Sequence, residues 1–471
     1  MFYGRTYELN IIKKAIVSKR AELGIVYGRR RIGKSSLLLK GISRKGDLYF
    51  EALQNVSNKK QINHFLHQLS VQTKSPKSIA DNWHEAFDIL TFHMKKKRCY
   101  VVFDEFPWMA SGRTELVSLV KYYWDNYWKK NPNLTMVICG SIANFMFKHI
   151  VHSKALHNRK TFEIKLAPLS ACESKLFFKQ YRSPYEIAKF LMVFGGIPKY
   201  LEQVDPQFSF SENIDRLCFQ KSSFFVNEFE TIFKEQFIVI KNYERIVRQI
   251  SQKSMSKEAL GRQLNIPSGG GLSSYIYNLE QADFIKVFKS NAPFGASREK
   301  TRKIVLWDEW LQFYFHYIAP NKRIIALNTE PGLFEKVSGQ SLNSFFGLVF
   351  EKFCMKNLSN IFKHMGVDIH QVVDYGPFFR QKNRTKSLDE GLQIDILVRK
   401  KGQMLTLIEC KFQSNPIGTS VISDVQRKIQ LLKAPKSYSI ERILVTAGEV
   451  TSNLNKNDYF HHILGIESLF Q

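Results

Sequence analysis

The chain has 471 residues, 44% of them hydrophobic, which is long enough for about two to four domains with buried cores. Its Lys and Arg residues exceed its Asp and Glu residues by 27. This surplus favours an anionic partner, with nucleic acid ahead of a membrane surface; the alternative is a basic surface that serves only solubility. The absence of a long apolar run, of a signal-peptide core and of any Cys-x-x-Cys spacing argues against a membrane protein, a disulfide scaffold and a zinc module, and predicts a cytoplasmic location.

The first motif is a phosphate-binding loop. Residues 28–35 read Gly-Arg-Arg-Arg-Ile-Gly-Lys-Ser, between an apolar run at 23–27 and a helical pattern at 36–40. In this strand–loop–helix unit Lys34 would reach the β- and γ-phosphates of a nucleotide, and Ser35 would bind Mg²⁺. The nucleotide-binding residues expected here are Gly28, Arg29, Arg30, Arg31, Ile32, Gly33, Lys34, Ser35 and Ser36.

The second motif is an apolar run, residues 99–103, that ends in two carboxylates, Asp104 and Glu105. A strand buried on both faces ends at the carboxyl edge of a parallel sheet, where ligands bind in such folds. We expect Asp104 to bind Mg²⁺, directly or through water, and Glu105 to polarise the attacking water. The alternative is a strand that ends in a solvated acidic turn.

Two weaker candidates follow. Ser141 ends another buried strand, 134–141, where it could sense the γ-phosphate or cap the helix expected at 142–149. Arg159 lies before an alternating strand, 162–166, and is a candidate arginine finger, in cis or from a neighbouring copy in a homo-oligomer. A solvated loop arginine is the more common outcome for such a residue.

These motifs resemble those of the archaeal-type ATPases, P-loop proteins related to the AAA+ and STAND classes and similar to the origin-recognition ATPases. The resemblance covers about residues 1–330. It implies an α/β fold with an AAA+-like parallel sheet, ATP as the ligand, and a helical lid whose Gly-x-Pro element brings Pro198 near the nucleotide. The residues that carry it are Phe2, Gly4, Arg5, Glu8, Leu9, the 28–35 loop, Asp104, Glu105, Gly140, Ser141 and the 195–201 stretch.

The middle of the chain predicts a helical lid and then three helices and two strands, 284–289 and 302–306, in the order of a winged helix-turn-helix. Its positive charge lies on the wing and not on the third helix, so contact with DNA phosphates is expected more securely than base reading. The alternative is a docking module between neighbouring domains. The wing residues are Lys286, Lys289, Arg298, Lys300, Arg302 and Lys303, and the polar residues of the third helix are Ser273, Ser274, Tyr275 and Asn278.

The last third contains two strands, 393–398 and 405–411, with Asp395 on the first and Glu409 and Lys411 on the second. Glu409 and Lys411 are two residues apart and face one side, which Asp395 can join from the neighbouring strand. The carboxylates could hold Mg²⁺, with Glu351 as a further ligand, while Lys411 orients water or stabilises the phosphorus centre. The alternative is an ordinary surface ion pair.

This set resembles the PD-(D/E)XK, restriction-endonuclease-like family over about residues 340–471, with Gln393-Ile394-Asp395 in place of Pro-Asp. The resemblance implies Mg²⁺-dependent cleavage of DNA, although some members of the family only bind it. Gln426 or Gln430, on the helix expected after the two strands, could face the site.

Together these patterns predict an ATPase core at 1–169, a lid at 170–238, a winged helix at 239–320 and a restriction-endonuclease-like α/β domain at 335–471. The predicted function is an ATP-hydrolysing, DNA-processing protein with a Mg²⁺-dependent endonuclease-like domain. The alternative is a STAND- or origin-recognition-like ATP switch that binds DNA or protein without cutting. A motor or chaperone unrelated to DNA is disfavoured by the charge and the winged helix.

Overall fold

A computed structural model describes residues 2–44, 46–94, 98–111, 113–141, 145–178, 182–237, 240–267, 269–289, 302–380 and 391–471. The chain forms two compact units. The first comprises residues 1–168, 197–199 and 232–238, and the second comprises 169–196, 200–231 and 239–471.

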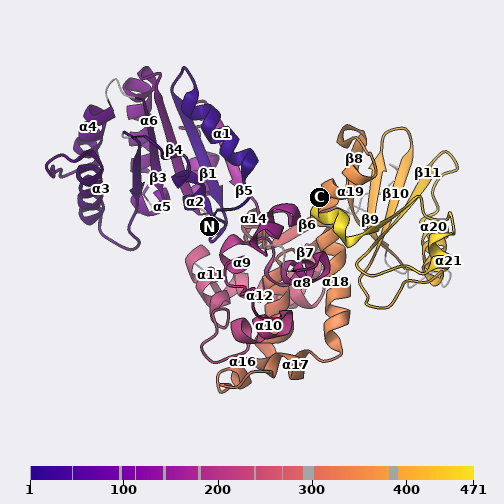
Figure 1. The fold of residues 1–471 in the computed structure, drawn as a ribbon. Helices are drawn as coiled ribbons and strands as arrows, with labels where there is room; N and C mark the ends of the chain where they lie inside the picture. The colour runs from indigo at the N-terminus through magenta and orange to yellow at the C-terminus, as the bar shows by residue number, and fades with distance from the viewer. Residues whose placement is uncertain are drawn as a thin grey trace. The chain divides into compact units, whose positions relative to one another are not determined.

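The first unit is built on a five-stranded parallel sheet (Figure 1). Its strands lie in the order β2-β3-β4-β1-β5, so β1 and β3 flank β4. Every residue of β1, β3 and β4 is buried, which explains why these strands are continuous apolar runs in the sequence. The strands are β1 Glu22–Gly28, β2 Leu48–Glu51, β3 Cys99–Asp104, β4 Leu134–Ser141 and β5 Phe162–Leu166.

Helices cover this sheet and complete its core. Aromatic rings of α3, α4 and the sheet form one cluster, in which Phe50 stacks on Phe65 at 4.2 Å and Phe87 stacks on Phe103 at 5.9 Å. The helices are α1 Thr6–Val17, α2 Lys34–Leu39, α3 Asn58–Thr73, α4 Trp83–Met94, α5 Phe106–Met109 and α6 Glu115–Asn126.

The second unit begins with a helical region. Three helices followed by the antiparallel hairpin β6–β7 occur in the predicted order, and Ser256 caps the second helix by accepting the Ala259 N–H. The loop between the two strands, with Arg298 and Lys300, lies outside the described residues. The elements are α8 Pro184–Phe194, α10 Phe210–Cys218, α12 Ile240–Gln252, α13 Lys257–Leu264, α14 Gly270–Gln281, β6 Ile285–Lys289, β7 Arg302–Leu306, α15 Glu309–Phe313, α16 Ala319–Ile325 and α17 Leu333–Ser338.

The aromatic-rich segment after β7 is a packing element. Trp310 is fully buried and lies 4.5 Å from the ring of Phe225. The segment continues into α16, which begins at Ala319 and contains Pro320 in its first turn. Over the described residues, no helix is both long and apolar enough to cross a membrane.

The C-terminal part of the second unit is a mixed sheet in the order β12-β11-β10-β9-β8 (Figure 1). Strands β8, β9 and β10 are antiparallel neighbours, whereas β10, β11 and β12 are parallel. Helix α20 joins β10 to β11 and buries Val421, Val425 and Leu432 in the core of this sheet. The elements are α18 Ser341–Lys356, α19 Leu358–His364, β8 Val372–Arg380, β9 Leu392–Lys400, β10 Met404–Lys411, α20 Ser420–Leu432, β11 Ser439–Thr446, α21 Ser452–Asn455 and β12 His462–Gly465.

Candidate functional site

The phosphate-binding loop lies between the end of β1 and the start of α2. Gly33 has a φ of 88°, a conformation that glycine adopts without steric cost. A Cβ on Gly28 would lie 2.8 Å from the carbonyl oxygen of Leu166, so the backbone approaches β5 too closely for a side chain. The ammonium of Lys34 is buried and donates to the carbonyl oxygens of Gly28 and Arg29, at 3.3 and 3.2 Å. The lysine thus folds back over its own loop.

The carboxylate of Asp104 contacts the phosphate-binding loop directly. Ser35 Oγ donates to Asp104 Oδ2 at 2.6 Å, and the Glu105 N–H donates to Asp104 Oδ1 at 2.8 Å. Asp104 is only 1% exposed. Both expected Mg²⁺ ligands, which are 69 residues apart in sequence, therefore lie side by side.

Sequence reasoning missed Tyr49. This residue of β2 donates its hydroxyl hydrogen to the same Oδ2 of Asp104. Burial and the neighbouring Asp104 raise the pKa of Tyr49 above its ordinary value, so it remains a donor. Only the sheet order puts its strand beside β3.

Ser141 joins the lysine to the second carboxylate. Its Oγ accepts from Lys34 Nζ at 3.0 Å and donates to Glu105 Oε1 at 2.9 Å. The hydroxyl is thus engaged by the predicted phosphate-binding lysine and the predicted catalytic glutamate, and residues 142–144 of the helix it was to cap lie outside the described part of the chain. Glu105 has a φ of 49°, which turns the chain sharply from β3 into α5.

Two distant segments border the loop. The Arg5 guanidinium donates to the Ile32 carbonyl oxygen at 3.1 Å in a buried position. A Cβ on Gly33 would lie 3.8 Å from Pro198 Cγ, so the proline packs beside the loop. Among the remaining loop residues, Arg29 is buried, Arg30 lies over the ring of Trp108, Arg31 has a φ of 65°, Ile32 is buried and Ser36 is exposed.

Arg159 is not brought into this cluster. Its Nε and Nη2 donate to the two carboxylate oxygens of Asp125, at 2.8 and 2.7 Å, and its Nη1 donates to the Ala155 carbonyl oxygen. The hydrogen bonds from Arg159 lower the pKa of Asp125. The guanidinium therefore has a structural partner, which spacing in the sequence did not indicate.

A second polar cluster lies in the C-terminal sheet. Asp395 of β9 and Glu409 of β10 are on adjacent strands, and Asp395 Oδ2 accepts the Cys410 N–H at 2.9 Å. Glu409 pairs through Oε1 with Lys411 at 3.0 Å and through Oε2 with Lys428 at 2.5 Å. The side chains of Glu409 and Asp395 are 1% and 7% exposed, so the two carboxylates are buried, whereas that of Lys411 is 32% exposed.

Lys428 of α20 was not predicted. Its ammonium also lies 3.7 Å from Asp395 Oδ1. The sequence had instead pointed to Gln426 or Gln430 on this helix, and both are exposed. The helix rotation set by its buried residues Val421 and Val425 directs position 428 to the carboxylates.

The third expected ligand, Glu351, lies nearby in a different state. Burial and the negative charge of Asp395 raise its pKa to about 8, and burial and Glu409 raise that of Asp395 to about 6. Within the described residues, no group of three or more His, Cys, Asp or Glu side chains could hold a metal ion. The metal-binding role of Glu351, Asp395 and Glu409 therefore stays a prediction.

The expected DNA-contacting residues mostly make contacts within the protein. Lys303 Nζ lies 3.4 Å from the ring centre of Phe379 in β8, and Lys286 lies 4.9 Å from that of Trp307. On α14, Ser273 accepts from Lys257, Tyr275 from Asn242, and Asn278 donates to Tyr243. Ser274 and Arg302 are exposed, and the side chain of Lys289 lies outside the described part. These contacts favour the docking alternative for the hairpin.

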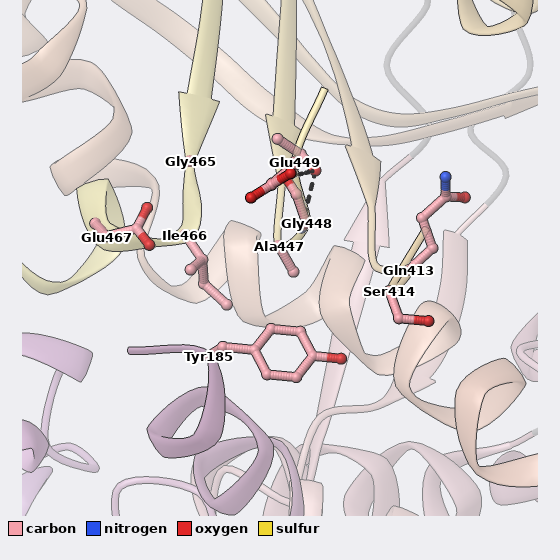
Figure 2. A pocket seen from close by; sticks show the side chains of 10 residues that line it. Tyr185, Gln413, Ser414, Ala447, Gly448, Glu449, Gly465, Ile466 and Glu467 are labelled. Atoms are coloured by element: carbon pink, nitrogen blue, oxygen red, sulfur yellow. Dashed lines mark hydrogen bonds between the residues drawn. The ribbon is translucent and has the colours of Figure 1, made fainter. Parts of the chain in front are cut away.

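A pocket of about 450 Å³ opens at the carboxyl ends of β10, β11 and β12. Figure 2 shows Tyr185 on one side of it and the carboxylates Glu449 and Glu467 among its lining. None of the described residues that line it carries a positive charge.

Comparison with known proteins identifies the first part of the chain. Residues 2–204 match the family described as "ATPase domain predominantly from Archaea", and residues 314–426 match one described as "Archaea bacterial proteins of unknown function". An uncharacterized protein of Methanocaldococcus jannaschii is 28% identical over 358 residues, which are 75% of this chain and 76% of that protein. Residues 2–204 are thus similar to a P-loop ATPase domain.

Similar solved structures include the Walker-type ATPase PABY2304 of Pyrococcus abyssi, with 18% identity, a TM-score of 0.46 and coverage of 67% of this chain and 96% of that chain. The ORC2 protein of Aeropyrum pernix, in ADPNP–ADP complexes, has 13% identity, a TM-score of 0.41 and coverage of 69% and 95%. Similarity of this degree carries nothing about activity or partners.

Proposed function

We propose that this protein hydrolyses ATP with Mg²⁺ and uses the nucleotide cycle to control the processing of DNA by its C-terminal domain, a divalent-metal-dependent phosphodiesterase. The proposed division is an ATPase core at 1–169, a lid at 170–238, a winged helix at 239–320 and a nuclease-like domain at 335–471. One observation carries the ATPase assignment: Lys34, Ser35, Asp104, Glu105 and Ser141 meet at the ends of three adjacent strands in two hydrogen-bonded groups that the Glu105 backbone joins.

The side chains present fit MgATP. The Ser35 hydroxyl and the buried Asp104 carboxylate are oxygen ligands of the kind that Mg²⁺ prefers, and they already lie 2.6 Å apart. When bound, the ion would neutralise charge on the β- and γ-phosphates. Lys34 would exchange its two carbonyl partners for phosphate oxygens. Glu105, held by Ser141, would accept the proton of the attacking water.

Support for the phosphodiesterase comes from chemistry and connectivity. Asp395 and Glu409 lie on adjacent antiparallel strands, Lys411 follows two residues later, and α20 then leads to a parallel strand, the order that the PD-(D/E)XK resemblance implies. Two buried carboxylates suit a divalent cation, which when bound would supply an activated water and charge neutralisation. Lys411 would orient that water toward the phosphate.

DNA is the proposed partner because the chain carries 27 excess positive charges. A homo-oligomer with Arg159 acting in trans belongs to the same proposal, but the arginine would first have to leave Asp125.

A second candidate function is an ATP switch that binds DNA or protein without cutting. The observation that favours it is Lys428, whose ammonium lies between the two carboxylates.

The test measures ATP hydrolysis, and cleavage of supercoiled plasmid with Mg²⁺ or Mn²⁺, with and without ATP, for wild type, Lys34→Ala and Asp395→Ala. We expect Lys34→Ala to abolish hydrolysis, and Asp395→Ala to abolish cleavage while hydrolysis persists. A wild type without ATPase activity would overturn the first assignment. Salt-sensitive DNA binding without cleavage in either metal would reject the phosphodiesterase and support the ATP switch.

A further inference from the structure

We propose that Lys428 is a tethered counter-ion that occupies the place of a divalent cation between Asp395 and Glu409, so that a metal enters only by displacing the ammonium. The proposal rests on the proposed metal-binding role of this carboxylate pair. It does not require that the domain cut DNA.

The hydrogen-bond partners of the carboxylates define that place. Asp395 Oδ2 accepts the Cys410 N–H at 2.9 Å, and Glu409 Oε1 pairs with Lys411 at 3.0 Å. The other oxygen of each group faces Lys428, whose Nζ lies 3.7 Å from Asp395 Oδ1 and 2.5 Å from Glu409 Oε2. A cation that bridges the two carboxylates would use these same two oxygens. The ammonium and the metal therefore compete for one position.

When no metal is bound, the burial of the two carboxylates makes a positive counter-charge necessary. The side chains of Glu409 and Asp395 are 1% and 7% exposed, and two buried carboxylates on adjacent strands repel each other. Lys411 pairs with Glu409, while Lys428 reaches both groups. Lys428 thus holds the two carboxylates in the paired arrangement that a metal needs.

The position of Lys428 also permits exchange. Its side chain is 22% exposed, although it lies on the same face of α20 as the residues that anchor this helix to the sheet, Val421, Val425 and Leu432. A lysine has a long flexible stem, so its ammonium can turn to solvent while the helix stays in place. Metal binding then breaks the two ion pairs of Lys428 but does not require α20 to refold.

The experiment measures Mn²⁺ binding to the full-length protein by electron paramagnetic resonance, without nucleotide. It compares wild type, Lys428→Met and Lys428→Gln, both neutral, with Lys436→Met, which removes an exposed lysine away from the site. We expect both neutral Lys428 variants to bind one Mn²⁺ at least about tenfold more tightly than wild type, because a nearby positive charge has gone. Lys436→Met should match wild type, and adding Glu409→Gln to Lys428→Met should abolish the tight site.

Thermal unfolding supplies a readout that a purely structural role would not give. Both neutral variants should melt below wild type in chelator and recover with Mn²⁺, since the ion replaces the lost counter-charge. Unchanged or weaker Mn²⁺ binding in both variants, or destabilisation that Mn²⁺ does not relieve, would overturn the proposal.

The two proposals fail separately. A tight Mn²⁺ site in Lys428→Met that Glu409→Gln removes, without plasmid cleavage by any variant, would reject the phosphodiesterase and support the counter-ion. Plasmid cleavage by wild type, together with a Mn²⁺ affinity that Lys428→Met does not change, would support the phosphodiesterase and reject the counter-ion.

Discussion

Ser141 provides the sharpest test of the nucleotide site, because its hydroxyl connects Lys34 with Glu105. Replacing it with alanine removes one acceptor from the lysine and one donor from the glutamate. Lys34 keeps the carbonyl oxygens of Gly28 and Arg29, so its position should change little. Glu105 loses the side-chain donor that orients its carboxylate.

The expected effect follows from these contacts. A hydrogen bond to a charged group contributes about 1.5–3 kcal/mol, and each 1.4 kcal/mol is about a factor of ten in rate. If the bond to Glu105 matters mainly in the transition state, Ser141→Ala should lower kcat by about 10- to 100-fold and change KM for ATP less than about threefold.

Steady-state ATPase assays at saturating Mg²⁺ measure both constants. Ser141→Thr, which keeps a hydroxyl, should recover much of the loss, and Ser118→Ala, an exposed serine on α6, should match wild type. A Ser141→Ala enzyme with normal kcat, or one with raised KM and unchanged kcat, would refute the orienting role.

Three further predictions concern contacts that the sequence did not reveal. Tyr49→Phe removes a donor to the Walker B aspartate, so half-maximal ATPase activity should need about three- to tenfold more Mg²⁺; an unchanged Mg²⁺ dependence would contradict this. Asp125→Asn should cost under about 1 kcal/mol at pH 7 by urea unfolding, since the pair with Arg159 is partly exposed. Because the pKa of Asp125 is lowered in the folded state, the pair's contribution is present above about pH 4, the ordinary pKa of an aspartate, and is lost as pH falls through the lowered pKa, so the stabilities of the variant and wild type should converge in acid. Gly196→Ala would put a Cβ 2.0 Å from the backbone oxygen of Leu169 and should cost about 3 kcal/mol, whereas a melting temperature equal to that of wild type would disprove the clash.

In the first unit, the buried strands and the glycines of the loop could be predicted from short stretches of sequence. The apolar runs at 23–27, 99–103 and 134–139 became fully buried strands, and the glycines of the 28–35 loop occupy positions that need them. Such features depend on neighbouring residues, because burial of a strand and the turn after it are encoded in short stretches. The convergence of Ser35 and Asp104 followed from one further rule, that parallel strands end at a common edge.

Contacts between elements required the structure. Tyr49 meets Asp104 because β2 lies next to β3, and Arg159 meets Asp125 across 34 residues of sequence. Lys286 and Lys303 of the predicted wing lie against aromatic rings, since β8 packs beside the hairpin.

The arrangement of the carboxylate cluster was likewise determined partly by the sequence and partly by the tertiary structure. The sequence by itself determined that Asp395, Glu409 and Lys411 share a face, because alternation along two strands joined by a tight turn is a local property. The tertiary structure alone decided that Lys428 stands between the carboxylates and that Glu351 is partly buried with a raised pKa. The rotation of a helix about its axis is set by which of its residues pack on the sheet, and burial depends on every element that covers a side chain, so neither can be deduced from the spacing of the residues themselves.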